Sequence, residues 1–531
     1  MALLPTDSFL STSPDTSKSV VIDGDTLDIG RLVSVARRYR PCFLDKSARK
    51  AVSQCAANLE QLAYQNTPIY GVNTGFGLLA SKKIDQEQLF NLSRNLVLSH
   101  SVGVGEPLQE DIVRAGLLVR ANTLAKGFSG VRPVLIDTLL SLLNKRVTPI
   151  IPSRGSLGSS GDLAPLAHLA LHISAHPDSQ GNEFSGKVWF NGKLLSGSEA
   201  LGAAGIAPVL LGPKEGLALI NGATFSSAML ALSIADAYII FDAAEKSAVL
   251  SFEALQGISS ALDDRIHRAR QHPGQIHVAR NLKQHLSGST LVDSSDRVQD
   301  AYSLRCIPQV IGPVYEILSF VHQMTLREIN AATDNPLIFQ MEAVSGGNFH
   351  GQPVGLGADY LKTAFCEVGS IAERRIFRLL SYEEQTGLPA MLIPDRSKSG
   401  LQSGLMLLQY TAASLVLENQ TLATPDSIRS LPTSGGQEDH NSNAMNAARN
   451  LMAILNNLTS VIAIEMITAC AALDIRRIQD TSQKPGKYAQ RLYEMVRSKV
   501  PVFESDAPWS DHIADVANLI QSGSFREIRS P

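Results

Sequence analysis

The sequence predicts a mainly α-helical protein, a bundle of long helices with a loop-rich N-terminal part and minor β-structure. Three observations lead to this fold class. Apolar residues recur at alternating steps of four and three from Leu401 to Leu415, on one face of a helix. Residues 450–475 are apolar on nearly all sides, as in the central helix of a bundle. Aromatic residues make up only 6% of the chain while leucine and small apolar residues dominate, which favours closely packed helices over a β-sandwich.

The 531 residues are enough for a large core, and the length alone predicts about two to four structural units. The stretch up to about Ser19 is rich in Ser, Thr, Pro and Asp and predicts no regular element. Residues 187–190, followed by Asn191-Gly192, predict a β-hairpin. Residues 357–380 predict another long helix. We divide the chain into an N-terminal part (1–213), a central long-helix bundle (214–480) and a C-terminal helical tail (481–531).

Two uncharged stretches, residues 216–235 and 400–417, are long enough to cross a bilayer. The first contains Asn221 and Ser226, and the second contains Gln409, whose polar groups would be costly in lipid. We therefore expect both stretches to be buried inside the protein, and we expect no membrane partner.

The composition excludes several classes of protein. Hydrophobic residues make up 44% and charged residues 18%, which excludes disorder for most of the chain. The formal net charge is -3, so no strongly basic face is implied and nucleic acid is not an expected partner. The five cysteines are scattered without a Cys-x-x-Cys pair, and the N-terminus lacks the pattern of a signal peptide. We expect a reducing, cytoplasmic location.

His168, His172 and His176 recur every four residues, which resembles a metal-binding face. Three such residues span about 12 Å of helix, too long for one ion. A pair could bind zinc, but no Glu follows the first His and no third ligand is evident. We expect no metal, and a structural role for His168.

A glycine- and serine-rich segment, residues 153–168, precedes an apolar run. Taken alone it predicts a loop before a helix, with Ser160 or Asp162 as the N-cap. No Gly-Lys-Ser/Thr ends it, which excludes a phosphate loop. The sequence Gly-Ser-Ser-Gly at 158–161 has the wrong spacing for a nucleophile elbow.

Residues 155–168, Gly-Ser-Leu-Gly-Ser-Ser-Gly-Asp-Leu-Ala-Pro-Leu-Ala-His, closely resemble the signature of the histidine and phenylalanine ammonia-lyases. In that family an Ala-Ser-Gly tripeptide cyclises into 4-methylidene-imidazol-5-one, an electrophile that no ordinary side chain provides. The resemblance implies that Ser159, Ser160 and Gly161 form this cofactor autocatalytically, with no external cofactor. The Gly161 nitrogen would attack the Ser159 carbonyl, and loss of two waters would leave Ser160 as a methylidene. Glycine lets the backbone bend without a Cβ clash.

The resemblance extends over about residues 30 to 480 and implies an ammonia-lyase-like fold. Residues 70–77, Tyr-Gly-Val-Asn-Thr-Gly-Phe-Gly, match the inner loop of the family, in which the tyrosine, here Tyr70, takes the β-proton. A phenol can act so if nearby cations lower its pKa. Ser99-His100 resembles the histidine-selective members, in which the His faces the substrate side chain.

Further motifs follow in the family's order. Residues 299–306, Gln-Asp-Ala-Tyr-Ser-Leu-Arg-Cys, are a strong match, in which Arg305 would grip the substrate carboxylate with two parallel hydrogen bonds. By the same resemblance Tyr302 and Gln299 support the cofactor ring and the carboxylate. Tyr302 and Arg305 are three residues apart, so one helical turn would let both face one cavity.

The remaining matches also imply roles. Asn221 lies near the cofactor, Asn335 orients the carboxylate or the cofactor, and Phe349 packs near it. Gln437-Glu438 resembles the histidine-type lyases, whereas phenylalanine lyases usually have Asp after the Gln. Glu438 would bind the substrate's ammonium or imidazole.

The chain departs from the family at three places. Ser159 replaces the usual Ala, Ala223-Thr224 replaces Thr-Gln, and Gly435-Gly436 replaces Ala-Asn. Because the first residue of the tripeptide contributes its carbonyl, Ser is chemically possible there.

Three hypotheses follow: a lyase converting L-histidine to urocanate; a lyase or 2,3-aminomutase acting on phenylalanine or tyrosine; and an inactive homologue whose tripeptide does not cyclise. His100 and Glu438 favour the first, whereas Gly436, Ala223 and Ser159 favour the others. The resemblance further implies a small amino acid substrate and a homotetramer whose active sites combine loops of several subunits.

Overall fold

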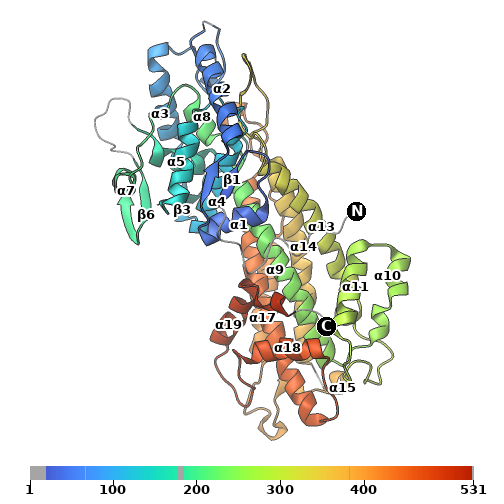
Figure 1. Cartoon of the computed structure of the whole chain (residues 1–531). Helices are drawn as coiled ribbons and strands as arrows, with labels where there is room; N and C mark the ends of the chain where they lie inside the picture. The colour runs from blue at the N-terminus through green and yellow to red at the C-terminus, as the bar shows by residue number, and fades with distance from the viewer. Residues whose placement is uncertain (1–18, 66, 80, 176–184, 382, 529–531) are drawn as a thin grey trace. The chain divides into compact units, whose positions relative to one another are not determined.

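The computed structural model describes residues 19–528 apart from 66, 80, 176–184 and 382. Contacts divide the chain into two compact units (Figure 1). Unit 1 comprises residues 1–235, 322–359 and 425–449, and unit 2 comprises residues 236–321, 360–424 and 450–531. Both units are discontinuous in sequence, so they do not test the linear ranges 1–213, 214–480 and 481–531, which stay a prediction.

Unit 1 is built from short helices around a buried central one. Helix α4 (Glu110–Ala125) is buried along its whole length from Ile112 and packs against α1 (Ile29–Arg38) and α5 (Pro133–Asn144). A second group, α3 (Leu89–His100), α6 (Leu163–Ile173) and α8 (Glu215–Ile220), packs together. The unit also contains α2 (Lys46–Ala63) and α7 (Gly197–Ala204).

The strands of unit 1 form small sheets of two or three strands. Their bounds are β1 (Val20–Ile22) parallel to β2 (Cys42–Leu44); β3 (Val104–Pro107) antiparallel to β5 (Pro152–Arg154); β4 (Thr148–Pro149), β6 (Lys187–Phe190) and β7 (Lys193–Ser196) in one antiparallel sheet; and β8 (Leu337–Phe339) with β9 (Glu342–Val344). The predicted hairpin is confirmed as β6 and β7, with Asn191 and Gly192 both at positive φ in the turn.

In the part of unit 2 that the structure describes, the regular elements are helices, joined by turns and loops. It contains α10 (Asp264–Arg270), α11 (Pro273–His285), α12 (Tyr302–Arg305), α15 (Glu383–Thr386), α16 (Met406–Leu422), α18 (Lys487–Arg497) and α19 (Ser510–Gln521). Four long helices have residues in both units: α9 (Thr224–Ala254), α13 (Ile307–Glu328), α14 (Gln352–Leu379) and α17 (Ala444–Gln479).

The mainly α-helical fold class is confirmed, and so are the long helices predicted over 357–380 and 450–475, within α14 and α17. Within the part of the chain that the structure describes, two helices, α9 and α17, are apolar and long enough to cross a membrane. In their most apolar windows 83% and 89% of the residues are buried inside the protein, as in core helices. Residues 216–235 thus lie in α8 and the first part of α9 rather than in one continuous helix.

The helix predicted from Leu401 to Leu415 was wrong at its start. Helix α16 begins at Met406, and Leu401 is 86% exposed in the preceding turn. Gly404 takes a left-handed φ of 62°, which a continuous α-helix cannot contain. Leu408 and Ala412, which follow it, are buried, but Leu407, Tyr410 and Leu417 are 57%, 60% and 63% exposed. The expectation that residues 400–417 are buried inside the protein was therefore wrong for this chain, since only one face of α16 packs against it.

Unit 2 buries a carboxyl group whose protonation we expect to make stability pH-dependent. Glu245 of α9 is buried, and Asn281 of α11 donates a hydrogen bond to it over 3.3 Å. Burial, assisted by the charge of Asp242, raises the pKa of Glu245 to about 8. A carboxyl whose pKa is higher in the folded state favours folding below its unfolded pKa, and loses that contribution as the pH rises through the folded value.

We therefore expect Glu245→Gln to match the wild type in stability near pH 5 and to exceed it by up to about 4 kcal/mol near pH 9. The amide keeps an acceptor for Asn281 and carries no charge at either pH. Thermal unfolding of both proteins from pH 5 to pH 9 measures the difference. A difference that is constant over this range would contradict the expectation.

Candidate active site

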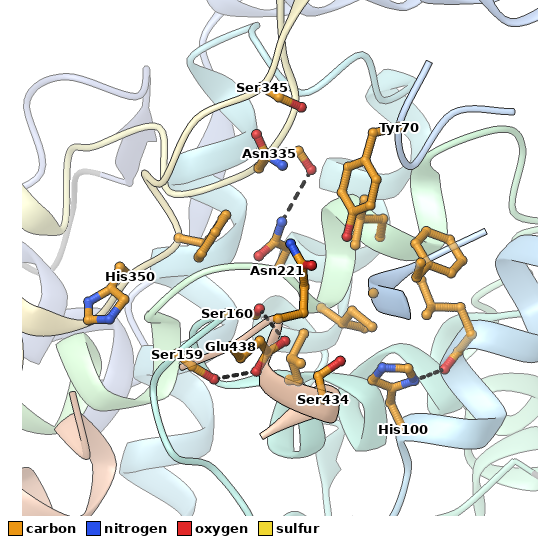
Figure 2. Close-up of a pocket in the computed structure, with 18 of the residues that line it drawn as sticks. Tyr70, His100, Ser159, Ser160, Asn221, Asn335, Ser345, His350, Ser434 and Glu438 are labelled. Carbon is orange, nitrogen blue, oxygen red and sulfur yellow. Dashed lines mark hydrogen bonds between the residues drawn. The ribbon is translucent and has the colours of Figure 1, made fainter. Parts of the chain in front are cut away.

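Most of the predicted site residues line one cavity of about 710 Å³ in unit 1 (Figure 2). The structure brings together Tyr70, His100, Ser159, Ser160, Asn221, Asn335, Phe349, Gln437 and Glu438. These side chains come from at least six separate stretches of the chain, from the loop after α2 to the loop before α17. The same cavity is lined by further residues that our reasoning did not single out, including Phe76, Ser345, Ser434 and His440.

The backbone of the Ser159-Ser160-Gly161 segment is bent against a second loop. The Gly222 N–H donates to the Ser160 carbonyl over 3.1 Å, and the Asp162 N–H donates to the Gly222 carbonyl over 2.9 Å. Gly161 has a φ of 78°, and a Cβ added there would lie 2.0 Å from the carbonyl carbon of Gly222. Only glycine fits this position, so the segment is held in a tight bend against Gly222.

Asp162, which follows the tripeptide, is fully buried. Its carboxylate accepts hydrogen bonds from the Ser156 hydroxyl (2.8 Å) and from the N–H (2.8 Å) and hydroxyl (2.9 Å) of Ser226. Burial raises the pKa of Asp162, and these hydrogen bonds oppose the effect. The residue precedes α6 as its N-cap, but its side chain caps no helix N–H of α6. It fastens the loop to the start of α9 instead.

Arg120 of α4 holds the backbone at Asn221 and Thr333, and the sequence analysis did not identify it. Its guanidinium is buried and donates to the carbonyls of Ala218 (2.9 Å) and Asn221 (2.6 Å), and to the carbonyl and hydroxyl of Thr333 (3.3 and 3.2 Å). Burial lowers the pKa of Arg120 to about 10, so it stays charged at neutral pH. The available signal was an arginine inside an apolar helical run, which implies a buried charge with several acceptors.

Asn221 keeps one unused acceptor at the cavity. Its amide nitrogen donates to the Asn335 carbonyl over 3.2 Å, while its Oδ1 is buried and has no hydrogen-bond partner among the residues that the structure describes. The Asn335 side chain is itself used, since its Oδ1 accepts from the Gly346 N–H over 2.7 Å. An orphaned buried acceptor is costly, and this one lies beside the bent tripeptide, where a group with a donor would satisfy it (Figure 2).

The carboxylate of Glu438 lies over the tripeptide (Figure 2). Its Oε1 accepts from the Ser160 hydroxyl over 2.9 Å, and its Oε2 accepts from the Ser159 hydroxyl over 2.6 Å. The backbone before it turns through Gly435 and Gly436, at φ values of 61° and 90°. A Cβ at Gly436 would meet nothing within 4 Å, so the glycine that replaces the family's asparagine leaves open space.

His100, at the end of α3, faces the cavity as a neutral ring. Its Nδ1 lies 2.9 Å from the Leu96 carbonyl, which can only accept, so Nδ1 carries the proton. Burial lowers the pKa of His100. The ring therefore leaves Nε2 as an acceptor at neutral pH.

Tyr70 is half-buried beside Phe76, whose ring meets it edge-on at a centroid distance of 6.5 Å. Burial raises the pKa of Tyr70 and the charge of Glu438 raises it further, while a hydrogen bond from the Gly77 backbone lowers it. None of the described residues that line the cavity is a lysine or an arginine. The described residues that line this cavity therefore do not provide the cation that we expected to lower the pKa of Tyr70.

Gln299, Tyr302 and Arg305 belong to unit 2 and do not line this cavity. They lie together: the Arg305 guanidinium donates to Gln299 Oε1 over 2.5 Å and stacks over the Tyr302 ring at 4.7 Å. Tyr302 and Arg305 share the single turn of α12, as predicted, and Tyr302 is 71% exposed. The three side chains thus form a preassembled cluster at the surface of unit 2.

The histidines of α6 make hydrogen bonds with the backbone. His168 Nε2 accepts from the Gly103 N–H over 3.0 Å, and His172 contacts the Lys187 carbonyl over 2.8 Å. His176 lies outside the described residues. Among the residues that the structure describes, no group of three His, Cys, Asp or Glu side chains is arranged to hold a metal ion.

Comparisons with known proteins cover nearly the whole chain. The sequence pattern of the family described as "aromatic amino acid lyase" matches residues 27–498. Histidine ammonia-lyase of Caldanaerobacter subterraneus subsp. tengcongensis is 44% identical over 96% of this chain and 98% of the relative. The corresponding protein of Alkaliphilus oremlandii is 42% identical over the same shares.

Solved structures agree with these sequence comparisons. Histidine ammonia-lyase from Trypanosoma cruzi superimposes with a TM-score of 0.87 and 35% identity, over 96% of this chain and 95% of that chain. Tyrosine aminomutase from Streptomyces globisporus does so with a TM-score of 0.89 and 35% identity, over 96% and 98%.

Proposed function

The chain belongs to the aromatic amino acid lyase family and is a carbon–nitrogen lyase, and from this premise we propose that it releases ammonia from L-histidine to give urocanate. The observation that supports L-histidine as the substrate is the presence of two hydrogen-bond acceptors at the cavity. They are the neutral His100 ring and the Glu438 carboxylate. An imidazole buried in a pocket needs polar partners for its nitrogens. The relatives named histidine ammonia-lyase support the same substrate.

We propose that Ser159, Ser160 and Gly161 form 4-methylidene-imidazol-5-one, with no external cofactor. The bend against Gly222 and the lack of room for any Cβ at Gly161 support this proposal. When formed, the group supplies an electrophile that activates the substrate for loss of its amine. Gly161 fits the group, since it has no Cβ to obstruct the bend that the ring needs, and Asn221 lines the same cavity.

The remaining roles follow from the positions of the side chains. Tyr70, at the cavity wall, takes the β-proton of the substrate. His100 Nε2 accepts an imidazole N–H, and Glu438 accepts a second N–H of the substrate. Asn335 and Gln437 orient the polar end of the substrate, and Phe349 packs against its apolar atoms.

The described residues that line the cavity of unit 1 include carboxylates and imidazoles but no lysine or arginine for the substrate carboxylate. We propose that Arg305 supplies this charge from another copy of the chain, in a cytoplasmic homotetramer with shared active sites. The exposed cluster of Arg305, Tyr302 and Gln299 is preformed for the task, because Gln299 holds the guanidinium in place. A charge delivered to the cavity would also lower the pKa of Tyr70.

The test is an ultraviolet assay of the pure protein with L-histidine, L-phenylalanine and L-tyrosine, with chromatography of the products. We expect urocanate from L-histidine at a rate at least about tenfold above either other substrate, since the polar partner of the imidazole N–H would be left unpaired. The open space beside Gly436 favours the alternative of a larger aromatic substrate. Cinnamate, coumarate or a β-amino acid as the main product, with no urocanate, would establish that alternative and refute L-histidine.

A further inference from the structure

We propose that the Ser159 hydroxyl is a positioning group that fixes the Glu438 carboxylate for substrate binding, in addition to the part that Ser159 takes in the cofactor. This inference rests on the proposed function, because it concerns the substrate-binding carboxylate of that site. It gives a function to the side chain of Ser159, at a position where the family usually has alanine.

The contacts separate the two oxygens of Glu438. Oε2 accepts from the Ser159 hydroxyl over 2.6 Å and from the Thr433 hydroxyl over 3.3 Å. Oε1 accepts from the Ser160 hydroxyl over 2.9 Å. Ser159 is buried, at 7% exposure, and Glu438 is half-buried, so these bonds are partly shielded from water. Hydrogen bonds to a carboxylate are stronger than those between neutral groups.

Cyclisation would use only one of these two serine hydroxyls. One water takes its oxygen from the Ser159 carbonyl and its hydrogens from the amide nitrogens of Ser160 and Gly161. The other takes the hydroxyl of Ser160 and the hydrogen on its Cα. The side-chain hydroxyl of Ser159 takes no part in either loss and remains attached to its Cβ.

The consequence for Glu438 is asymmetric. Its Oε1 loses the Ser160 donor and becomes free for an N–H of the substrate, while its Oε2 keeps Ser159 and Thr433. The carboxylate is then fixed through Oε2, and Oε1 is available to accept a hydrogen bond from the substrate. The alanine that the family usually has at this position could hold nothing there.

The loop that carries Glu438 explains why this chain gains from such an anchor. Gly435 and Gly436 precede Glu438 at left-handed φ values, and Gly436 borders open space. Glycines give a loop more conformational freedom, which must be lost when the loop is fixed. The Thr433 N–H bonds to the Glu438 carbonyl over 2.8 Å and fixes the backbone, and Ser159 fixes the side chain. Two departures from the family, at 159 and at 435–436, are then linked.

The test uses a Ser160→Ala background, which cannot lose a side-chain water and in which Oε1 is free, so that binding is measured without turnover. Calorimetry compares L-histidine binding to Ser160→Ala, to the double variant with Ser159→Ala, and to the double variant with Ser159→Thr. We expect the Ser159→Ala double variant to bind about tenfold more weakly, the worth of one hydrogen bond to a charged group, and the Thr variant, which keeps the donor, to bind like the background. Ser53→Ala, which removes an exposed hydroxyl on α2, serves as the control without effect.

A ligand-free measurement keeps the inference separate from the proposed substrate. Hydrogen exchange of the peptide covering residues 433–440 should be faster with Ser159→Ala than in the Ser160→Ala background alone. In a Glu438→Gln background the substitution at 159 should have a smaller effect on both measurements. Unchanged exchange, or equal affinity of the two variants for L-histidine, overturns the role of Ser159. Faster exchange without any binding of L-histidine would support the anchor and refute the substrate.

Discussion

Replacing Ser160 with alanine should reduce the release of ammonia from L-histidine by more than about 10³-fold, because the electrophile supplies a large part of the acceleration. Alanine has no hydroxyl to lose, so the methylidene carbon cannot form. The side chain of Ser160 donates one hydrogen bond, to Glu438, and the bond from the Gly222 N–H to its backbone carbonyl remains available. The folded structure should therefore survive the substitution. Initial rates followed by urocanate absorbance measure the loss.

The matched measurement is the intact mass of the Ser160→Ala protein beside the wild type. We expect the mass of the wild type to be two waters below the mass calculated from its sequence. The variant should not lose the water that contains the Ser160 hydroxyl. Thermal unfolding should place the two proteins within a few degrees of each other. Full activity in the variant would show that the reaction does not depend on an electrophile formed from Ser160.

Replacing Tyr70 with phenylalanine should lower kcat by about 10²- to 10⁴-fold, the usual contribution of a general base. The ring keeps its contact with Phe76, and only the hydroxyl is lost. We expect little change in KM and an unchanged mass deficit, since the tripeptide lies on another segment. A variant with near-wild-type kcat would show that the β-proton goes to another group.

The same variant tests the shared active site. Neither Tyr70→Phe nor Arg305→Leu should be active alone, but mixed tetramers pair a wild-type Tyr70 of one copy with a wild-type Arg305 of another. After unfolding and refolding an equal mixture, about a quarter of the wild-type rate should return, since a quarter of random pairings are intact. No regained activity would mean that both residues act within one chain.

The parts of the fold that followed from the sequence are those fixed by local pattern. Helix α17 and the β6–β7 hairpin were predicted because an apolar surface or a turn pair is visible within a few residues. The start of α16 was not, because the left-handed Gly404 outweighs the apolar spacing that continues across it. The two discontinuous units could not be predicted, since they depend on contacts between distant segments.

The site divides in the same way. Motif resemblance placed Tyr70, His100 and Glu438 at one cavity, and the structure puts them there. Arg120 was missed because its acceptors lie 98 to 213 residues away along the chain and are mostly backbone carbonyls, which no side-chain pattern reveals. Ser159 was identified as a departure, but its partner Glu438 is 279 residues distant, so only the structure gives its hydroxyl a role.

The most direct test of the central claim is the intact mass of the freshly purified wild-type chain, with peptide mapping to locate any loss. The account predicts a deficit of two waters confined to the peptide that contains Ser159, Ser160 and Gly161. A mass equal to that of the unmodified sequence, in protein that is folded and tetrameric, would contradict it.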